Sequence, residues 1–374
     1  MRNIFEIKHL SSIISSVNGP VYVLNDITFS IEKGKTIGIV GESGSGKTQL
    51  MMAMTGIQPL TPGVVSGNVR YSDKSDILFY PNELELKKHY LVHHRTNSEN
   101  YLRKNAQSFE RSIRKKFSNL RGTVFGIIPQ DPKSYLNPYW TIEELFKEAY
   151  NKLFEIGQAK EKELEKFIYN NFEKFDLDIA VKNKYPDELS GGEAQRVMNA
   201  FVLAHKPKVI FADETTTGID VTRQKKVIKQ FKLIKSENSD TTIIIISHDF
   251  AFLNHLVDAY IVMFGGFVVE AIHDKNKLKT MEDLHPYTVD LISSLHSSNN
   301  KIQKETIDNF IDLKIKPNGC PYKARCKLYS MGNLELQPLC ENELPPIINP
   351  FSGEKVEELN TDWQRCWYPY LETK

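Results

Sequence analysis

The sequence has few cysteines, almost no net charge and no long apolar run. Its 374 residues include four cysteines, all at or after position 320, which excludes a disulfide-built scaffold. Lys and Arg number 48 against 47 Asp and Glu, so there is no electrostatic case for a general nucleic-acid binder. The longest uncharged apolar stretch, from Ala259 to Val269, is shorter than the roughly 20 residues of a membrane-spanning helix. This stretch is predicted to be a buried strand and turn.

The start of the chain also lacks the pattern of an export signal. Arg2, Glu6 and Lys8 interrupt the first apolar residues before a signal-peptide core can form. Hydrophobic residues make up 40% and charged residues 25%, which excludes wholesale disorder and allows a sizeable core. We therefore expect a cytosolic protein of about two domains, in which any membrane role comes through a partner.

Short β-branched runs alternate with helical patterns along much of the chain. Examples are Thr36–Val40, Val209–Ala212 and Thr242–Ile246. Continuous apolar runs of this length are typical of strands that are covered on both faces. The pattern therefore predicts an α/β fold around a parallel sheet.

A helical insert interrupts this alternation between about Ser134 and Leu189. Thr141 followed by Glu144 forms a capping box, and apolar residues then recur at helical spacing. A second, more charged helix is expected over about Ala159–Phe175.

Two other stretches depart from the α/β pattern. Residues 71–120 are polar, with ten Lys and Arg against six Asp and Glu, and are expected to form an insertion at the surface. Ser297–Asn300 indicates a linker, after which several prolines predict a tail that is rich in loops.

A phosphate-binding loop is the most specific motif. The run Gly41-Glu42-Ser43-Gly44-Ser45-Gly46-Lys47-Thr48 matches G-x-x-x-x-G-K-[ST] between a strand and a helical pattern, as this motif requires. Its glycines allow backbone N–H groups to face one point, where a phosphate can lie on the helix N-terminus. Lys47 would then reach the β- and γ-phosphates of a nucleotide, and the Thr48 hydroxyl would ligate Mg²⁺.

Two carboxylates end the apolar run at Val209–Ala212. Asp213 offers the oxygen ligand that Mg²⁺ prefers, and Glu214 could polarise an attacking water as a general base. Many buried strands end in solvated acids, so this pair indicates a site only together with the phosphate-binding loop.

A second anion site is indicated where a later helix begins. Ser190 and Glu193 form a capping box, and Gly191 and Gly192 between them expose the first N–H groups of the helix. An ordinary capped helix would have the same pattern.

Two side chains that follow strands could join such a site. His248 follows Thr242–Ile246 and could contact a γ-phosphate and hold the water beside Glu214. Gln130 also follows a strand, where its amide could complete the Mg²⁺ shell.

Together these motifs resemble the ABC-type ATPases. The resemblance covers about residues 3–272 and lies in the order of the phosphate-binding loop, the Gln130 loop, Leu189-Ser190-Gly191-Gly192, Asp213-Glu214, Asp220 and His248. It implies an ATPase domain over 1–273, with a helical subdomain at about 134–190 and a polar insertion at about 74–118, followed by a tail over 274–374.

The resemblance also implies the roles of individual residues. ATP and Mg²⁺ would be bound by Gly41, Ser43, Gly44, Gly46, Lys47, Thr48, Gln130 and Asp213, with Asp220 beside them. Glu214, His248 and Gln130 would be catalytic. The helix that begins at Ser190-Gly191-Gly192-Glu193 would cap the ATP held by a partner subunit.

Finer matches resemble the D-type ATP-binding subunits of oligopeptide and dipeptide importers. They are Gln130-Asp131-Pro132, Tyr185-Pro186, His285-Pro286-Tyr287-Thr288 and Gly319-Cys320-Pro321. This implies a peripheral protein at the cytoplasmic face of the cell membrane, with a related second ATPase, two permeases, an extracellular solute-binding protein and no nucleic acid. Two alternatives are a nickel or other small-solute importer of the same subfamily and a soluble ABC-type ATPase that acts on ribosomes.

Small departures from the family pattern lie beside the motifs. Neither Ile13 nor Ile14 is aromatic, although the family usually stacks an aromatic residue on adenine near this position. Tyr22 is a substitute candidate, but a tyrosine in an apolar strand is more often a core residue. Thr215 replaces the usual proline and leaves the neighbouring carboxylates in place.

The cysteines of the tail suggest a metal centre. Cys320, Cys326, Cys340 and Cys366 are separated by 5, 13 and 25 residues, and the absence of a C-x-x-C pair argues against a zinc ribbon. Four thiolates in one tail could hold a [4Fe–4S] cluster or a zinc ion, or they could be unliganded. The resemblance implies the cluster, because similar subunits of peptide importers carry one in such a tail.

Overall fold

The chain folds into two compact units. The computed structural model describes residues 3–16, 19–58, 62–73, 76–80, 111–155, 157, 163–213, 221–296, 318–331 and 335–368. The first unit combines residues 1–117 with 248–374, and the second unit comprises residues 118–247. The first unit therefore contains both the phosphate-binding loop and the cysteine tail.

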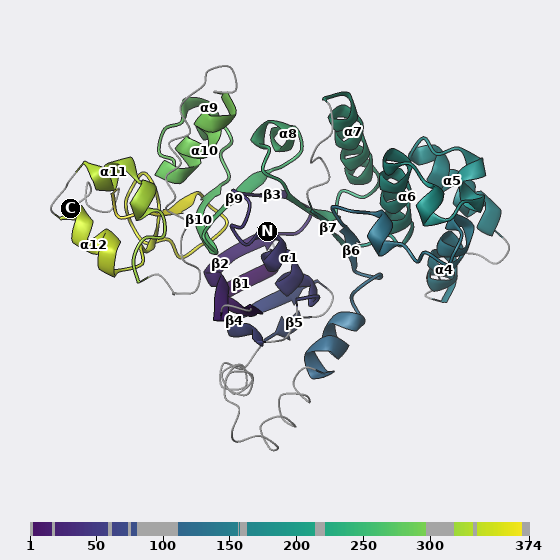
Figure 1. Ribbon diagram of the computed structural model, residues 1–374, viewed down its shortest axis with the longest axis horizontal. Helices are drawn as coiled ribbons and strands as arrows, with labels where there is room; N and C mark the ends of the chain where they lie inside the picture. Colours follow the sequence, from purple (N-terminus) through teal and green to yellow (C-terminus); the bar gives the residue numbers. More distant parts are fainter. Residues whose placement is uncertain are drawn as a thin grey trace. The chain divides into compact units, whose positions relative to one another are not determined.

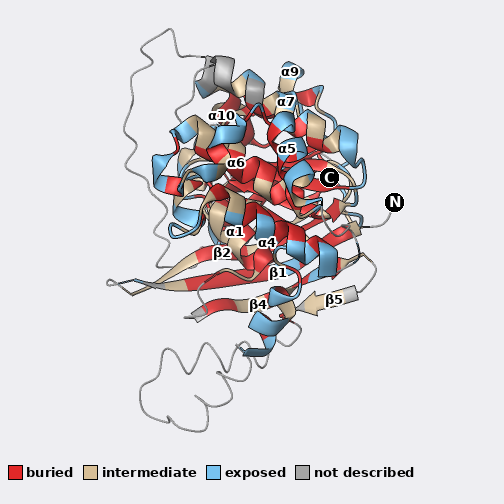
Figure 2. Ribbon diagram, turned by 90° about the vertical axis from the view of Figure 1, so that its right-hand side faces the viewer, coloured by how far each residue is buried: buried red, intermediate tan, exposed pale blue. Residues whose placement is uncertain are grey.

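An antiparallel sheet in the first unit has the strand order β2-β1-β4-β5 (Figure 1). Its strands are β1 (Asn3–Ser16), β2 (Gly19–Glu32), β4 (Pro62–Ser72) and β5 (Asp76–Phe79). Buried residues are concentrated along β1 and β2 (Figure 2).

The polar stretch 71–120 contributes core residues at both of its ends. Tyr80, which follows β5, is buried and donates a hydrogen bond to the Ala53 carbonyl at 3.2 Å. Phe117, in a helix over 111–118, is fully buried against Gly56, where an added Cβ would lie 2.1 Å from the phenyl ring. Residues 81–110 lie outside the described residues.

Five further paired strands of the first unit extend from β3, which precedes the phosphate-binding loop, into the tail. β3 (Thr36–Val40) is parallel to β9 (Ala259–Phe264), and β9 is antiparallel to β10 (Phe267–Ile272). β10 then pairs with β12 (Trp363–Arg365), and β12 pairs with β11 (Ile347–Ile348). The tail thus continues the sheet beyond β10.

Short helices complete the first unit. They are α1 (Lys47–Thr55), α8 (Phe250–Asn254), α9 (Lys277–Thr280) and α10 (Pro286–His296), followed in the tail by η4 (Lys323–Arg325), α11 (Lys327–Ser330) and α12 (Leu336–Asn342). The linker expected at 297–300 lies outside the described residues.

The second unit contributes three parallel strands and a group of helices. β6 (Phe125–Ile128) pairs with β7 (Val209–Asp213), which pairs with β8 (Thr242–Ile246). The helices are α4 (Ile142–Glu155), α5 (Leu164–Lys174), α6 (Gly191–Ala204) and α7 (Val221–Glu237), with the short turns η1 (Lys133–Tyr135), η2 (Ile179–Asn183) and η3 (Pro186–Glu188). The rings of Phe146, Phe172 and Phe201 join α4, α5 and α6, with centroids 5.2 and 5.9 Å apart.

Most of the elements expected from the sequence are present. The three β-branched runs form β3, β7 and β8, and the stretch from Ala259 to Val269 forms β9, a Gly265-Gly266 turn and the start of β10. α4 begins at the predicted capping box, where the Thr141 N–H donates to the Glu144 carboxylate at 2.7 Å. Within the described ranges, no helix has the length and hydropathy needed to cross a bilayer.

Candidate functional site

The phosphate-binding loop lies between β3 and α1 and needs glycine for steric reasons. A Cβ at Gly41 would lie 2.2 Å from the Met263 carbonyl oxygen, and one at Gly46 would lie 2.6 Å from the Val23 carbonyl oxygen. Gly44 and Gly46 also have positive φ angles of 80° and 99°, which side chains disfavour. The loop therefore packs closely against β9 and β2.

Lys47 is folded into this loop. Its ammonium donates to the carbonyl oxygens of Gly41 at 2.9 Å and of Glu42 at 2.8 Å, and the side chain is buried. Burying a lysine charge is costly unless oxygen atoms surround it. The loop thus concentrates positive charge beside the N-terminus of α1, where an anionic phosphate would be stabilised.

The second unit holds the other residues expected at the nucleotide. Asp213 is the last residue of β7 and is buried, whereas Gln130 is exposed in the loop after β6. Because β6 and β7 are parallel neighbours, both residues lie at the edge of the sheet where the carboxyl ends of these strands meet. Glu214 and Asp220, together with Thr215, lie outside the described residues.

The predicted capping box at the start of α6 is confirmed. The Glu193 N–H donates to the Ser190 hydroxyl, and the Ser190 N–H donates to the Glu193 carboxylate at 2.8 Å. This hydrogen bond and the Lys184 ammonium at 2.9 Å lower the pKa of Glu193 to about 2. Gly191 is exposed and Gly192 half-exposed, so this helix end is accessible from solvent.

His248 and Tyr22 lie in the first unit. His248 is exposed just before α8, whose Asp249 cap accepts a hydrogen bond from the Phe252 N–H. Tyr22 lies on β2 opposite Ile13 and is half-buried. Its intermediate exposure means that it is not a fully buried core residue.

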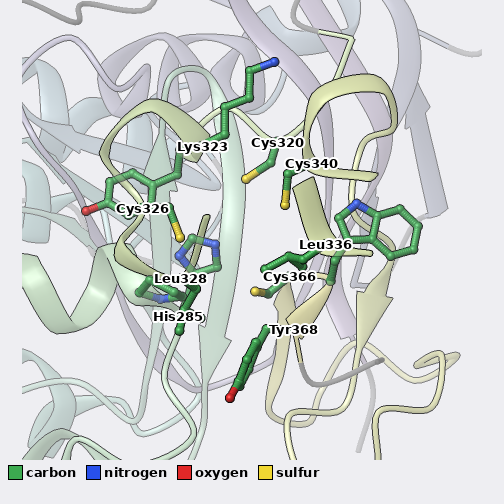
Figure 3. Close-up of a pocket in the computed structure, with 12 residues that line it drawn as sticks. His285, Cys320, Lys323, Cys326, Leu328, Leu336, Cys340, Cys366 and Tyr368 are labelled. Carbon is green, nitrogen blue, oxygen red and sulfur yellow. The ribbon is translucent and has the colours of Figure 1, made fainter. Parts of the chain in front are cut away.

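The four cysteines of the tail come together. Cys320, Cys326, Cys340 and Cys366 all line one small cavity, with His285, Leu336 and Trp367 among the other lining residues (Figure 3). The Cys320 N–H donates to the Cys340 carbonyl at 2.8 Å, which joins the segment at Cys320 to α12. The separations along the sequence gave no indication of which cysteines would be neighbours.

Burial dominates the chemistry of these thiols. It raises the pKa of Cys320 to about 12 and that of Cys340 to about 11, and it also raises the pKa values of Cys326 and Cys366. His285 is buried too, and its pKa falls to about 4. In the described part of the chain, no group of three or more His, Cys, Asp or Glu side chains is placed to hold a metal ion. The geometry therefore does not support the expected metal centre by itself.

Two further residues contact the phosphate-binding loop at Glu42. The Arg325 guanidinium makes two hydrogen bonds to the Glu42 carboxylate, at 2.8 and 2.9 Å, and the Tyr287 hydroxyl accepts one from the Glu42 N–H at 2.8 Å. In the sequence, Tyr287 stands out only as part of a family match, and Arg325 belongs to no motif. Their positions, in α10 and next to Cys326, carry no local signal for a contact with residue 42.

Comparison with known proteins identifies the family. The family model described as "ABC transporter" matches residues 24–217. The chain belongs to the ABC transporter family. It is 29% identical to the oligopeptide transport ATP-binding protein AppD of Bacillus subtilis, over 95% of this chain and 96% of AppD. It is 30% identical to the oligopeptide transport ATP-binding protein OppD of Escherichia coli, over 86% of this chain and 85% of OppD.

Solved structures agree with this ABC assignment at the level of the fold. The chain matches a dimeric ATP-binding cassette in a post-hydrolysis state with ADP and phosphate, at a TM-score of 0.53 and 20% identity, over 72% of this chain and 98% of that one. It matches CbiO1 of Clostridium perfringens, part of an ABC transporter complex, at a TM-score of 0.52 and 23% identity, over 78% and 100% of the two chains. The resemblance to ABC-type ATPases and the expected fold are confirmed.

Proposed function

We propose that this chain is the ATP-hydrolysing subunit that powers import of oligopeptides or dipeptides through a membrane ABC transporter. The observation that carries the proposal is the glycine-dependent loop around Lys47 in a chain that aligns over most of its length with oligopeptide transport ATP-binding proteins. The alignment with AppD spans 95% of the chain and therefore extends into the cysteine tail. Both the ATPase part and the tail are thus shared with a peptide-transport protein.

The proposed chemistry is in-line attack of water on the γ-phosphorus of ATP. As the new P–O bond forms, the bond to the ADP oxygen breaks and Glu214 takes the proton from the water. Lys47 stabilises the charge that develops on the γ-phosphate, and His248 orients the phosphate and the water. Thr48, Gln130 and Asp213 offer the hard oxygen ligands that suit Mg²⁺, which would offset further phosphate charge.

The capped end of α6 is proposed to complete the ATP site of a second, related ATPase subunit. The two glycines after Ser190 present N–H groups at an accessible helix N-terminus, where the helix dipole favours an anion. Asp220 would stand beside the same interface. A nucleotide site shared by two subunits needs such a helix end, because one subunit must present exposed N–H groups to the phosphate that the other subunit binds.

An exposed aromatic surface of the second unit is proposed to dock onto a permease. Tyr135, Tyr139, Trp140 and Tyr185 are exposed, and Tyr139 has 86% of its surface accessible. The Ile142 N–H donates to the Lys184 carbonyl at 3.0 Å, which keeps these segments side by side. Aromatic residues that are exposed together are typical of the centre of a protein interface. This contact would place the chain at the cytoplasmic face of the cell membrane.

The cysteine cavity is proposed to hold an iron–sulfur cluster. Four thiolates on one zinc ion, each about 2.3 Å from the metal, would lie only about 3.8 Å apart. A cluster binds each cysteine through a different iron atom, so it suits thiols that surround a common cavity but are not gathered on one point. Cys320, Cys326, Cys340 and Cys366 would be the ligands, and the cluster would supply cross-linking between the loops of the tail.

Hydrolysis is tested with Glu214→Gln in the transporter reconstituted with its permeases. The variant should bind ATP as the wild type does but hydrolyse it about 10² to 10⁴ times more slowly, with peptide uptake into vesicles lost in parallel. Glu237→Gln, an exposed position at the end of α7, is the matched control and should retain both activities. Wild-type hydrolysis by the Glu214 variant would refute the assignment, and ATP-driven uptake of nickel but not of peptides would refute the substrate class.

The cluster is tested by anaerobic purification followed by iron and acid-labile sulfide analysis. Iron and sulfide in equal amounts, lost together in a Cys320→Ser variant, are expected. Stoichiometric zinc without iron would instead identify a zinc site.

A further inference from the structure

Glu42 lies inside the phosphate-binding loop and is held from outside the loop. Its carbonyl accepts hydrogen bonds from the Lys47 ammonium at 2.8 Å and the Ser45 N–H at 3.2 Å. Its N–H donates to the Tyr287 hydroxyl, and its carboxylate accepts both hydrogen bonds of the Arg325 fork. The residue whose carbonyl accepts from Lys47 is therefore also held by α10, through its N–H, and by the cysteine tail, through its carboxylate.

Arg325 is itself held by a buried aromatic group. Its guanidinium lies over the rings of Phe264 and Tyr322, 5.5 and 5.6 Å from their centroids. Phe264, Tyr287 and Tyr322 pack against one another with centroids 4.6 to 5.4 Å apart, and both tyrosines are almost fully buried. The bidentate geometry and the ring contacts suit arginine and not lysine.

The charge of Glu42 gives this contact a consequence for nucleotide binding. A carboxylate in a loop that must accept a triphosphate repels the ligand, and a guanidinium paired with it removes most of that repulsion. Since the two side chains are partly exposed, at 31% and 39%, the effect is screened and moderate.

We infer that Arg325 is a positioning residue for nucleotide binding: it neutralises Glu42 and, through the Glu42 side chain, holds the residue whose carbonyl accepts from Lys47. It thereby makes ATP affinity depend on the cysteine-bearing loop 320–326. Cys320 and Cys326 bracket the segment that carries Tyr322 and Arg325, and both cysteines line the tail cavity. A displacement of this loop would move the guanidinium away from Glu42. This inference rests on the proposed function, since it concerns the same ATP site.

The test is a double-mutant cycle on ATP affinity, measured by titration of the purified full-length chain with Mg-ATP. Arg325→Ala should weaken ATP binding about fivefold to tenfold, because it exposes the Glu42 charge and releases the loop. In a Glu42→Gln background the same substitution should weaken binding less than twofold. The loss in the single variant should also shrink at high salt, which a general loss of structure would not explain.

Lys327→Ala is the matched control, since it removes a nearby cation that pairs with Asp290 at 3.4 Å and not with Glu42. It should leave ATP affinity unchanged. If Arg325→Ala does not fold, Arg325→Lys keeps the charge without the fork and should weaken binding about twofold to threefold. Equal losses with and without Glu42→Gln, or no loss at all, would overturn the inference. A wild-type chain that binds no ATP would instead refute the proposed function.

Discussion

Arg365 donates hydrogen bonds to both the carboxylate and the backbone carbonyl of Asp26, at 2.8 and 3.0 Å, although the two residues are 339 positions apart. Arg365 directly precedes Cys366, just as Arg325 directly precedes Cys326. Each of these arginines carries an ion pair from the tail to the ATPase part of the first unit. The cysteine loops and the nucleotide-binding fold are therefore joined at two separate points.

Substituting Arg365 should weaken the docking of the tail. The arginine side chain is only 7% exposed and that of Asp26 is 26% exposed, so Arg365→Ala leaves a partly buried carboxylate with only the exposed His9 imidazole beside it. We expect a loss of about 2 kcal/mol, below the cost of a fully buried pair. Urea unfolding followed by tryptophan fluorescence measures it, because Trp363 is fully buried on the same strand. Arg114→Ala, on an exposed helix face, is the control, and an equal loss there would contradict the assignment.

Glu270 should make the stability of the first unit depend on pH. Burial raises its pKa from 4.5 to about 8, against the opposing effect of hydrogen bonds from Thr288 and the His285 N–H. Since the pKa is higher in the folded protein than in the unfolded chain, the stabilising contribution is complete below pH 4.5 and is lost as the pH rises through about 8.

The measurement compares the wild type with Glu270→Gln across that interval. The wild type should lose a few kcal/mol of unfolding free energy relative to the variant, at about 1.4 kcal/mol for each unit of pKa shift. Glu282→Gln, at an exposed position, should follow the wild type at every pH. A constant difference between wild type and Glu270→Gln would show that Glu270 titrates normally.

The glycines of the phosphate-binding loop should differ in their tolerance of alanine. At Gly41 an added Cβ would meet the Met263 carbonyl oxygen at 2.2 Å, whereas at Gly44 nothing lies within 4 Å. Gly41→Ala must displace backbone and should abolish ATP binding. Gly44→Ala is strained only by its φ of 80°, a cost of about 1–2 kcal/mol. Similar losses of ATP affinity in the two variants would mean that the backbone φ angle, and not the room for a Cβ, is the reason why the loop needs glycine.

The aromatic surface can be separated from catalysis by assembly measurements. Tyr139→Ala should leave ATP binding and thermal stability of the isolated chain unchanged, because its side chain is 86% exposed. Co-purification with the permeases should fall about tenfold, as for a residue near the centre of an interface. Tyr169→Ala, exposed on α5 in the same unit, should assemble normally. If both variants assemble equally well, Tyr139 lies outside the docking surface.

Local patterns predicted the parts of the fold that depend on neighbouring residues. The strands β3, β7 and β8 were recognisable because they are continuous apolar runs, and the capping boxes at Thr141 and Ser190 because each spans only three positions. The same reasoning placed Lys47 in a loop between a strand and a helix, and Asp213 at a strand end. The strands follow from the preference of apolar β-branched residues for buried strands, and the capping boxes follow from hydrogen bonds within one helical turn.

Contacts between distant segments could not be predicted in this way. Arg325 and Glu42 are 283 positions apart, and neither a helical nor a strand period relates them. The stretch 71–120 was expected to lie at the surface, but Tyr80 and Phe117 are buried. Their burial depends on contacts with α1 and with Gly56 at its C-terminal end, which no local pattern shows. Composition describes a whole stretch, whereas packing is decided by single residues within it.

The pairing of β12 with β10 means that the tail is not a removable appendage. β10 uses Glu270 and Ala271 to pair with Gln364 and Trp363 of the tail. A chain shortened before residue 318 would leave that edge of β10 open, and open apolar strand edges recruit strands from other molecules. Loss of the tail should thus appear first as poor solubility and aggregation during expression, before any effect on transport can be measured.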